Sequence, residues 1–405
     1  MKKYIISVIL WVNLSILFSL NYRLSGNFRY YFQGYTPYKS LGVDKKSTGK
    51  MKNVLRLNNQ FEIFDDMRLQ LEFETGGILS GSNMPNEQDI GIVSNYNTSQ
   101  YRLADLDGRV YPDDDDVGSF YLNSDLDRLF LSYRMNWADL YLGRQAVAWG
   151  SGHLINPTDI LIPVSYDQLD TKSRSGIDAV RLRIPIGIMD EMDLGAAFGE
   201  DFETDKSAYY FRLRLYRFNS DISLLSGLYR KNLLLGLDIT RSFMGAGIWT
   251  ELAFHKMDIT ESANEQDNSL NFVVGTDYNF TEKLYTYWEY YHNSSGETRS
   301  RNYWNNLDKK AYQQSNIYLL GRNYIACGST YQLKPLIPLN MMVMYNLDDN
   351  SANFAPALEY NIAPDIYLGI GAYLGIGAET DNPLSPESEF GLYPNFFYTS
   401  FEVYF

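Results

Sequence analysis

Strict alternation of apolar and polar side chains is the feature that most limits what this chain can fold into. Residues 67–74 read Met-Arg-Leu-Gln-Leu-Glu-Phe-Glu, and residues 210–216 read Tyr-Phe-Arg-Leu-Arg-Leu-Tyr. Successive side chains of an extended strand point to opposite faces, so each segment has one apolar and one polar face. The apolar face needs an apolar neighbour, which is either a protein core or the hydrocarbon of a membrane.

The length and spacing of these segments favour the membrane over a soluble β-sandwich. Many segments reach the roughly 9–11 residues that a tilted strand needs to cross a bilayer. Tiny turns and long polar loops separate them alternately, and aromatic residues crowd their ends, as in outer-membrane barrels. We therefore expect an all-β fold: a single transmembrane antiparallel up-and-down β-barrel of about 18 strands, or about 16, with long extracellular loops. The expected strands lie at residues 24–36, 53–64, 67–79, 126–136, 138–149, 177–187, 191–199, 207–218, 221–230, 232–243, 246–257, 268–280, 284–293, 317–333, 339–347, 353–362, 366–377 and 392–405.

Composition excludes several other classes. The net charge of -14 argues against a nucleic-acid binder, which needs cations for the phosphates. A mean hydropathy of -0.30 argues against a bundle of membrane helices. One cysteine allows no internal disulfide, and three histidines leave little for a metal site, so we expect no cofactor and no metal.

The first residues have the pattern of an export signal. Lys2 and Lys3 precede an apolar run over residues 4–20, which predicts a signal peptide at 1–21 and a barrel over 22–405. No small-x-small cleavage pattern follows the run, so an uncleaved anchor helix is the alternative.

The last residues have a second specific pattern. Phe397, Thr399, Phe401, Val403 and Phe405 share one face of a final strand. A last strand that ends on phenylalanine resembles the recognition strand of bacterial outer-membrane barrels. The resemblance implies a bacterial outer-membrane location, with outer-membrane lipid and the barrel assembly machinery as partners and Phe405 as the assembly signal. An ordinary edge strand is the alternative, although an exposed apolar edge would be an aggregation hazard.

One segment carries a family resemblance. Gly143-Arg144-Gln145, Trp149-Gly150 and Asn156-Pro157-Thr158-Asp159 follow one another, and Glu289-Tyr-Tyr-His-Asn-Ser-Ser-Gly296 comes later. This order resembles the G-R-Q-x-x-x-W-G … N-P-x-D pattern of porin-like bacterial outer-membrane β-barrels, which implies a barrel with a pore but names no solute. The candidate loop-motif residues are Arg144, Trp149, Asn156 and Asp159. The alternative is that the motif only folds its loop.

Charged residues on the polar faces are candidates for a pore lining. A charge on the lipid face near the bilayer midplane costs roughly 2–4 kcal/mol, so the lumen is the favoured location. There they could create a field that selects solutes, or they could only pair with one another and stabilise the barrel. The candidate lining residues are Arg68, Glu72, Arg128, Arg181, Arg183, Arg212 and Arg214, with Arg56 and Arg134 on similar faces.

Two connections, 80–125 and 150–176, are long enough to be functional. We expect at least one to fold inward and set its acids opposite Arg128, Arg181, Arg183 or Arg212. The acids are Asp105, Asp107 and Asp113–Asp116 in the first loop, and Asp159, Asp167 and Asp170 in the second. Solvated outer loops are the alternative.

The function these patterns favour is a porin-like channel for passive diffusion of small hydrophilic solutes, without enzymatic activity. A barrel of about eighteen strands is wide enough for an aqueous channel. A plugged structural barrel is one alternative. Another follows from His292, Ser294 and Asn305, which resemble the H-x-S … W-N stretch of outer-membrane phospholipase A; the resemblance implies Ser294 as nucleophile, His292 as base and Asn305 as the group orienting it.

Overall fold

The computed structural model describes residues 21–36, 47–81, 101–104, 108–110, 120–162, 174–259, 268–315, 317–379 and 385–405. The expected signal peptide lies outside these residues, apart from Asn21. So do the acids Asp105, Asp107, Asp113–Asp116, Asp167 and Asp170.

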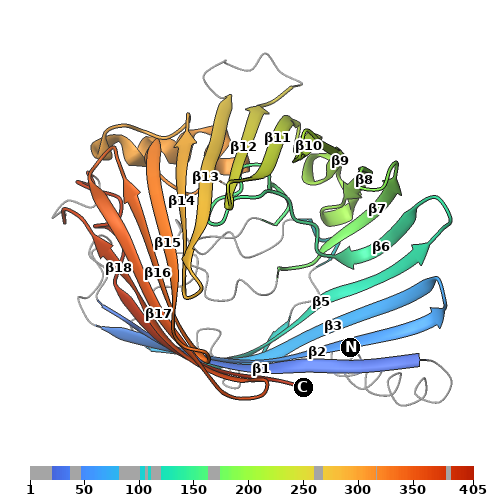
Figure 1. The fold of residues 1–405 in the computed structure, drawn as a ribbon, viewed down its shortest axis with the longest axis horizontal. Coiled ribbons are helices and arrows are strands. Elements are labelled where there is room, and N and C mark those ends of the chain that lie inside the picture. The colour runs from blue at the N-terminus through green and yellow to red at the C-terminus, as the bar shows by residue number, and fades with distance from the viewer. Residues whose placement is uncertain are drawn as a thin grey trace.

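A closed antiparallel barrel forms the molecule (Figure 1). The described residues contain nineteen strands in one sheet; β4 pairs only with β5, so the ring consists of the other eighteen. Pairing of β1 with β19 closes the ring. The strands are β1 (Asn21–Tyr35), β2 (Thr48–Phe64), β3 (Met67–Ser80), β4 (Gly108–Val110), β5 (Phe120–Arg134), β6 (Asp139–Gln145), β7 (Ile177–Pro185), β8 (Glu191–Ala197), β9 (Ala208–Arg217), β10 (Ser220–Tyr229), β11 (Asn232–Phe243), β12 (Ala246–Lys256), β13 (Ser269–Thr281), β14 (Leu284–Asn293), β15 (Asn323–Lys334), β16 (Ile337–Asn346), β17 (Ser351–Ala363), β18 (Ile366–Ile376) and β19 (Phe396–Tyr404).

The prediction of an eighteen-strand barrel is confirmed. The alternation of residues explains which side chains of the wall face outward and which face the lumen. In β9 and β10, Phe211, Leu224 and Leu228 are exposed on the outside, whereas Tyr210 and Leu225 are buried inside. Tight turns join the hairpins at one end of the barrel and the long connections lie at the other. Within the described residues, no helix has the length and apolar character to cross a membrane.

Five strands, namely β2, β5, β6, β15 and β19, differ from the predicted bounds by four residues or more at one end. β5 begins at Phe120, so the loop expected over 80–125 is shorter than predicted. β15 begins at Asn323 rather than at 317, because η5 (Ser300–Asp308) and α2 (Lys310–Gln314) precede it. β6 ends at Gln145 rather than at 149, after Gly143 with φ +113°. The chain then leaves the wall, so the prediction of Trp149 at a strand end is wrong.

The C-terminal strand shows how the ring closes. Gly26 and Phe405 exchange backbone hydrogen bonds of 2.8 and 3.0 Å. A Cβ atom on Gly26 would lie 2.7 Å from the Phe405 ring, so only glycine leaves room for that ring. The apolar final strand is therefore paired along both edges, with β18 and with β1.

Apolar cores lie inside the barrel rather than between layers. One contains Trp149, Leu161 and Tyr210, and a second contains Ile155, Trp249 and Phe390. A third joins Tyr303 and Tyr312 to neighbours from the connection between β14 and β15. Inward-folded loops therefore fill part of the lumen with packed side chains.

Candidate functional site

The segment 146–162 after β6 folds into the lumen and reaches the wall of β11–β14 (Figure 1). The side of the wall that it contacts is the inner one, because Trp249 and Ala253 on that face are buried while Ile248 on the other is exposed. We call this segment the constriction loop. The prediction that one of the two long loops folds inward is confirmed for the loop after β6.

Glu251 of β12 fastens the loop in the middle of this wall. Its fully buried carboxylate accepts hydrogen bonds from the Thr158 N–H and Oγ1, each at 2.7 Å, and from the Ser151 N–H at 3.2 Å. The Ser151 hydroxyl also donates to Asp238 of β11 at 2.5 Å. Three loop donors converge on this one carboxyl group, so Glu251 holds both ends of the 151–158 turn.

Glu289 of β14 fastens the tip of the same loop. Its carboxylate accepts the N–H groups of His153 and Leu154 at 2.5 and 3.1 Å, and the Trp249 indole N–H at 3.0 Å. The His153 ring stacks on Tyr287 with ring centroids 4.5 Å apart. Burial lowers the pKa of His153, and nearby Asp277 opposes that shift. Thus the sequence stretch that begins at Glu289 contacts the stretch that follows Trp149.

The loop-motif residues shape the loop and do not meet as one solute site. The Trp149 ring packs edge-on against Tyr210 with centroids 4.7 Å apart. Gly150 has φ +99°, and a Cβ atom there would lie 2.3 Å from the Asn156 side chain. The Asn156 carbonyl accepts the Asp159 N–H at 3.0 Å, which closes the turn.

Asp159 and Arg144 hold the two flanks of the loop. The buried Asp159 carboxylate pairs with Arg174, and burial raises its pKa to about 6 despite that partner. Arg144 of β6 is also buried; it bonds to both carboxylate oxygens of Asp178 at 2.9 Å and to the Leu126 carbonyl at 3.0 Å. The strand register continues through Gly143 without a shift in the described pairing, so Arg144 is part of a regular strand.

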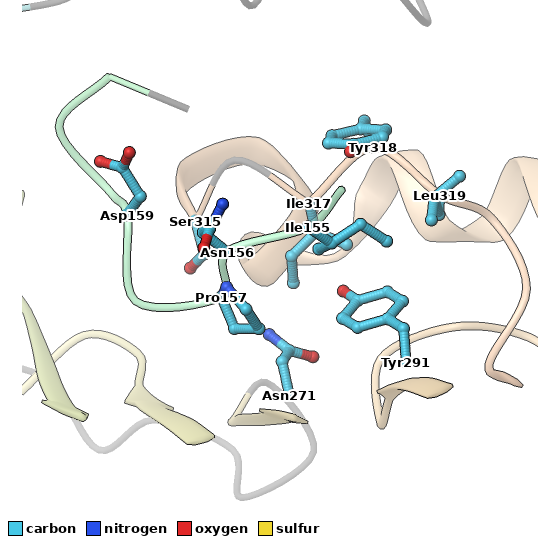
Figure 2. A pocket seen from close by; sticks show the side chains of 10 residues that line it. All are labelled: Ile155, Asn156, Pro157, Asp159, Asn271, Tyr291, Ser315, Ile317, Tyr318 and Leu319. Atoms are coloured by element: carbon cyan, nitrogen blue, oxygen red, sulfur yellow. The ribbon is translucent and has the colours of Figure 1, made fainter. Parts of the chain in front are cut away.

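A small cavity lies where the constriction loop meets the segment after α2 (Figure 2). Its volume is about 30 Å³, enough for about one water molecule but not for a solute. The lining residues are Ile155, Asn156, Pro157, Asp159, Asn271, Tyr291, Ser315, Ile317, Tyr318 and Leu319. This side of the lumen is closely packed.

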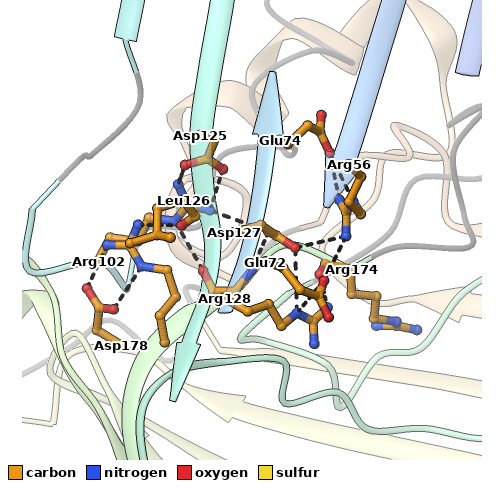
Figure 3. A network of polar contacts seen from close by, with 12 residues as sticks. Arg56, Glu72, Glu74, Arg102, Asp125, Leu126, Asp127, Arg128, Arg174 and Asp178 are labelled. Carbon is orange, nitrogen blue, oxygen red and sulfur yellow. Dashed lines mark hydrogen bonds and ion pairs between the residues drawn. The ribbon is translucent and has the colours of Figure 1, made fainter. Parts of the chain in front are cut away.

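The wall of β2, β3 and β5 is charged instead (Figure 3). Arg56 bonds to Glu74 at 2.7 Å and to Asp127 at 3.0 Å, and it lies 3.3 Å from Glu72. Asp127 is the unpaired residue of a β-bulge opposite Glu72, which turns it toward Arg56. Arg128 lies 3.7 Å from Glu72 and donates to the Arg174 carbonyl at 2.6 Å. Of the loop acids predicted to lie opposite Arg128, Asp159 pairs with Arg174 instead, and the others lie outside the described residues.

A second charged wall is formed by β7, β8 and β9. Arg181 forms a two-pronged ion pair with the fully buried Asp193, with contacts of 2.9 and 2.5 Å. Arg183 bonds to Glu191 at 2.5 Å, and Arg214 lies 4.0 Å from the same carboxylate. Arg212 donates to the Ser223 hydroxyl at 2.7 Å. Within the described residues, Arg181 and Arg183 therefore pair with acids of β8, and the predicted partners other than Asp159 lie outside these residues.

Two further arginines lie at the short-turn rim. Arg68 is nearly half exposed and lies 3.4 Å from Glu62, and Arg134 is 74% exposed near Asp139. Both residues lie beside the short turns, and the constriction loop leaves the wall at the other end of the strands. Sequence reasoning missed Glu251, Asp193 and the role of Glu289. The available signal was a carboxylate on the same strand face as large apolar residues, such as Glu251 two residues after Trp249.

The phospholipase alternative does not assemble as the resemblance implies. Asn305 is an exposed residue of η5 rather than the partner of His292. His292 Nδ1 lies 2.9 Å from the Asn323 side-chain oxygen instead, because β15 pairs directly with β14 there. The Ser294 hydroxyl accepts the Leu270 N–H at 2.8 Å, so it contacts the backbone of β13.

Comparison with known proteins shows the fold. No protein-family model matches the sequence, and no curated protein matches it. Among solved structures, a BenF-like porin from Pseudomonas fluorescens Pf-5 matches with a TM-score of 0.58 at 10% identity, over 95% of this chain and 99% of that one. The outer membrane protein opdK from Pseudomonas aeruginosa matches with a TM-score of 0.55 at 8% identity, over 95% and 98% of the two chains. OccAB2 of Acinetobacter baumannii matches with a TM-score of 0.55 at 7% identity and the same coverage. The chain has the eighteen-strand barrel fold of outer-membrane porins.

Proposed function

We propose that this protein is an outer-membrane channel through which small hydrophilic solutes diffuse passively. The observation that carries the proposal is the unequal filling of the lumen. The constriction loop packs against the inner face of β7–β14 near the long-connection end. Nearer the short turns, Arg183 of β7 and Arg214 of β9 keep 32% and 47% of their side chains exposed inside the ring. Exposed guanidinium groups on an inner face border a space that admits water and polar solutes.

The location and partners in this proposal follow from the outer surface. The outward side chains of the wall are apolar and exposed, including Leu194, Phe211 and Leu228, which suits outer-membrane lipid. Phe405, at the end of the closing strand, is proposed as the signal that the barrel assembly machinery recognises. We assign no catalytic residue.

The family resemblance is part of the proposal. The stretch around Trp149 and the stretch that begins at Glu289 lie more than 130 residues apart, yet the Glu289 carboxylate bonds to the N–H groups of His153 and Leu154. A porin-like family that carries both stretches would use them together to hold a loop across the lumen. This contact supports membership of such a family.

Conductance in planar lipid bilayers tests the function directly. Purified, refolded protein is expected to produce discrete current steps in KCl, while a heat-denatured sample produces none. A plugged structural barrel would give no steps. To exclude a channel that is merely closed in vitro, the Glu251→Gln/Glu289→Gln variant is measured in parallel. Absence of steps in both proteins contradicts the channel.

A further inference from the structure

A cluster of aromatic rings lies on the inner wall of β18, β19 and β1, across the ring from the arginines of β7–β9 (Figure 1). Phe396 of β19 is paired with Tyr373 of β18 and with Tyr35 of β1, and its ring centroid lies 4.6 and 5.4 Å from theirs. The rings of Tyr373 and Phe396 are parallel within 15°. Tyr398, two residues further along β19, has its centroid 6.3 Å from that of Tyr373. We call these four residues the aromatic patch.

Strand alternation directs the patch into the lumen. Phe397, which separates two residues of the patch, is 53% exposed on the outer face, so its neighbours in β19 point inward. Glu402 shares the inward face and is paired with Arg29, which lies 3.8 Å from Glu74 of the charged wall. All four rings of the patch are partly exposed rather than buried. They therefore keep surface that faces the interior of the barrel.

Small side chains lie beside the patch. Gly371 of β18 is paired with Tyr398 on one side and with Ala357 of β17 on the other. A Cβ atom on Gly371 would lie 2.5 Å from the Tyr398 ring, so this ring lies over β18 and leans toward β17. Asn340 of β16 is exposed and is paired with Ala357 from the far side. The aromatic face and the amide group therefore stand two strand spacings apart, about 10 Å, with only a methyl group between them.

Hydrogen-bonding groups flank the small residues. The Asn340 side-chain oxygen accepts the Thr330 hydroxyl at 2.7 Å, which leaves the N–H₂ group as the part of this amide that can donate to a solute. Glu359 and Ser400 lie one row nearer the short turns and are paired through Gly369. The ring faces are thus accompanied by an amide donor in one row and by a carboxylate and a hydroxyl in the next.

The patch differs in charge from the wall of β7–β9. The strands β16, β17, β18 and β19 contain no lysine or arginine. An anionic solute would therefore find no cation on these strands and would meet the carboxylates of Glu359 and Glu402. The ring faces and the hydrogen-bonding groups suit a neutral solute instead.

A neutral sugar matches this combination of groups. The C–H groups on one side of a pyranose ring pack against the electron-rich face of an aromatic ring, while its hydroxyl groups both donate and accept hydrogen bonds. A cation would also be attracted to aromatic faces and a carboxylate. The N–H₂ group of Asn340 would repel a cation, however, whereas it can donate to a sugar hydroxyl.

We propose that the aromatic patch binds neutral sugars inside the channel, with a pyranose ring stacked on Tyr398 and Tyr373 between Asn340 and Glu359. This inference deepens the proposed function, because it names the class of solute that passes this wall. The arginines of β7–β9 are then not the groups that bind the solute.

Calorimetry with the full-length protein folded in detergent tests the site. The probes are maltohexaose, cellohexaose and chitohexaose, which are neutral chains of six sugar units. At least one is expected to bind the wild type, and Tyr373→Ala/Tyr398→Ala is expected to weaken that binding about tenfold through the loss of two ring contacts. Tyr373→Phe/Tyr398→Phe keeps the ring faces and should retain most of the affinity. Tyr360→Ala, which removes an aromatic side chain that is 44% exposed on the outer face of β17, is the matched control and should bind as the wild type does.

Current through planar bilayers, recorded on the same samples, separates failure of the site from failure of the channel. If the wild type gives current steps but binds none of the three sugars, or if the double alanine variant binds as tightly as the wild type, the sugar site is wrong and the channel stands. Binding of tetraethylammonium in place of the sugars, lost in the same variant, would assign the patch to cations and overturn the inference. Sugar binding that the variant loses, in a protein that gives no current steps, would support the site and contradict the channel.

Discussion

Two neighbouring stretches of the inner wall use carboxylates in opposite ways. On the wall of β7–β9, Asp193 and Glu191 pair with arginines of the neighbouring strands. On the wall of β12–β14, the described residues place no lysine or arginine within 4.0 Å of Glu251 or Glu289, and these carboxylates accept loop N–H groups instead. In the first arrangement, acids and arginines of the wall pair with one another. In the second, carboxylates of the wall hold the constriction loop against it.

The difference explains where the wall holds the constriction loop by hydrogen bonds. A carboxylate without a cation partner needs several donors when it is buried, and a loop backbone supplies them in a fixed geometry. A carboxylate already paired with arginine has less capacity to hold a loop. The path open to a solute therefore depends on which group each charged side chain of the wall is bonded to, and not on the polarity of the wall alone.

The largest effect is expected from Glu251→Gln/Glu289→Gln. Each glutamine replaces a charged acceptor by one oxygen and an N–H₂ group that faces the loop donors, at a cost of roughly 3 kcal/mol or more to the loop contacts. We expect higher single-channel conductance and faster proteolysis within 146–162. Glu200→Gln, at an exposed rim position, is the control. Unchanged conductance would show that the loop is held by its apolar contacts alone.

The charged wall is tested by Arg181→Ser/Arg183→Ser. Removing both arginines leaves the buried Asp193 without its partner, and breaking a buried pair costs about 3–5 kcal/mol. We expect the anion-to-cation permeability ratio, read from reversal potentials in a KCl gradient, to shift toward cations. Arg212→Ser should produce a smaller shift with little loss of stability, because Arg212 bonds to Ser223 rather than to a carboxylate. If neither variant changes the ratio, these charges belong to the scaffold.

The pH dependence of stability should report Asp159. Its pKa is raised from 3.8 to about 6, so the folded protein binds this proton more tightly than the unfolded chain. The carboxyl group therefore contributes most stability below about pH 4 and loses that contribution as the pH rises through about 6. The shift corresponds to about 3 kcal/mol. Thermal unfolding of the wild type relative to Asp159→Asn, measured from pH 4 to 7, should show this loss; a constant difference would contradict it.

The smallest effect is expected from Ser294→Ala. Ser294 bonds to the Leu270 N–H, so its loss should leave conductance unchanged and cost about 1 kcal/mol or less. Purified protein should release no fatty acid from phospholipid vesicles. Hydrolysis that Ser294→Ala abolishes would instead establish the phospholipase alternative.

The pattern of residues is sufficient to predict the barrel. Alternation such as that of residues 67–74 marks one apolar face per strand, and this local signal does not depend on distant partners, so all eighteen ring strands could be located. That at least one of the two long loops folds inward could also be predicted from their length, although not that it is the loop after β6. The strand end at Gln145 could not, because Trp149 suits a strand as well as it suits a core.

The pairing of the charged side chains, in contrast, could not be predicted from local sequence. The local sequence pattern does not distinguish an acid that pairs with arginine, as Asp193 does, from an acid that holds a loop, as Glu251 does. The distinction arises from strand register and from the path of a loop about 100 residues away in the chain. Local periodicity fixes the direction of a side chain, but its partner depends on long-range contacts that only the closed barrel brings together.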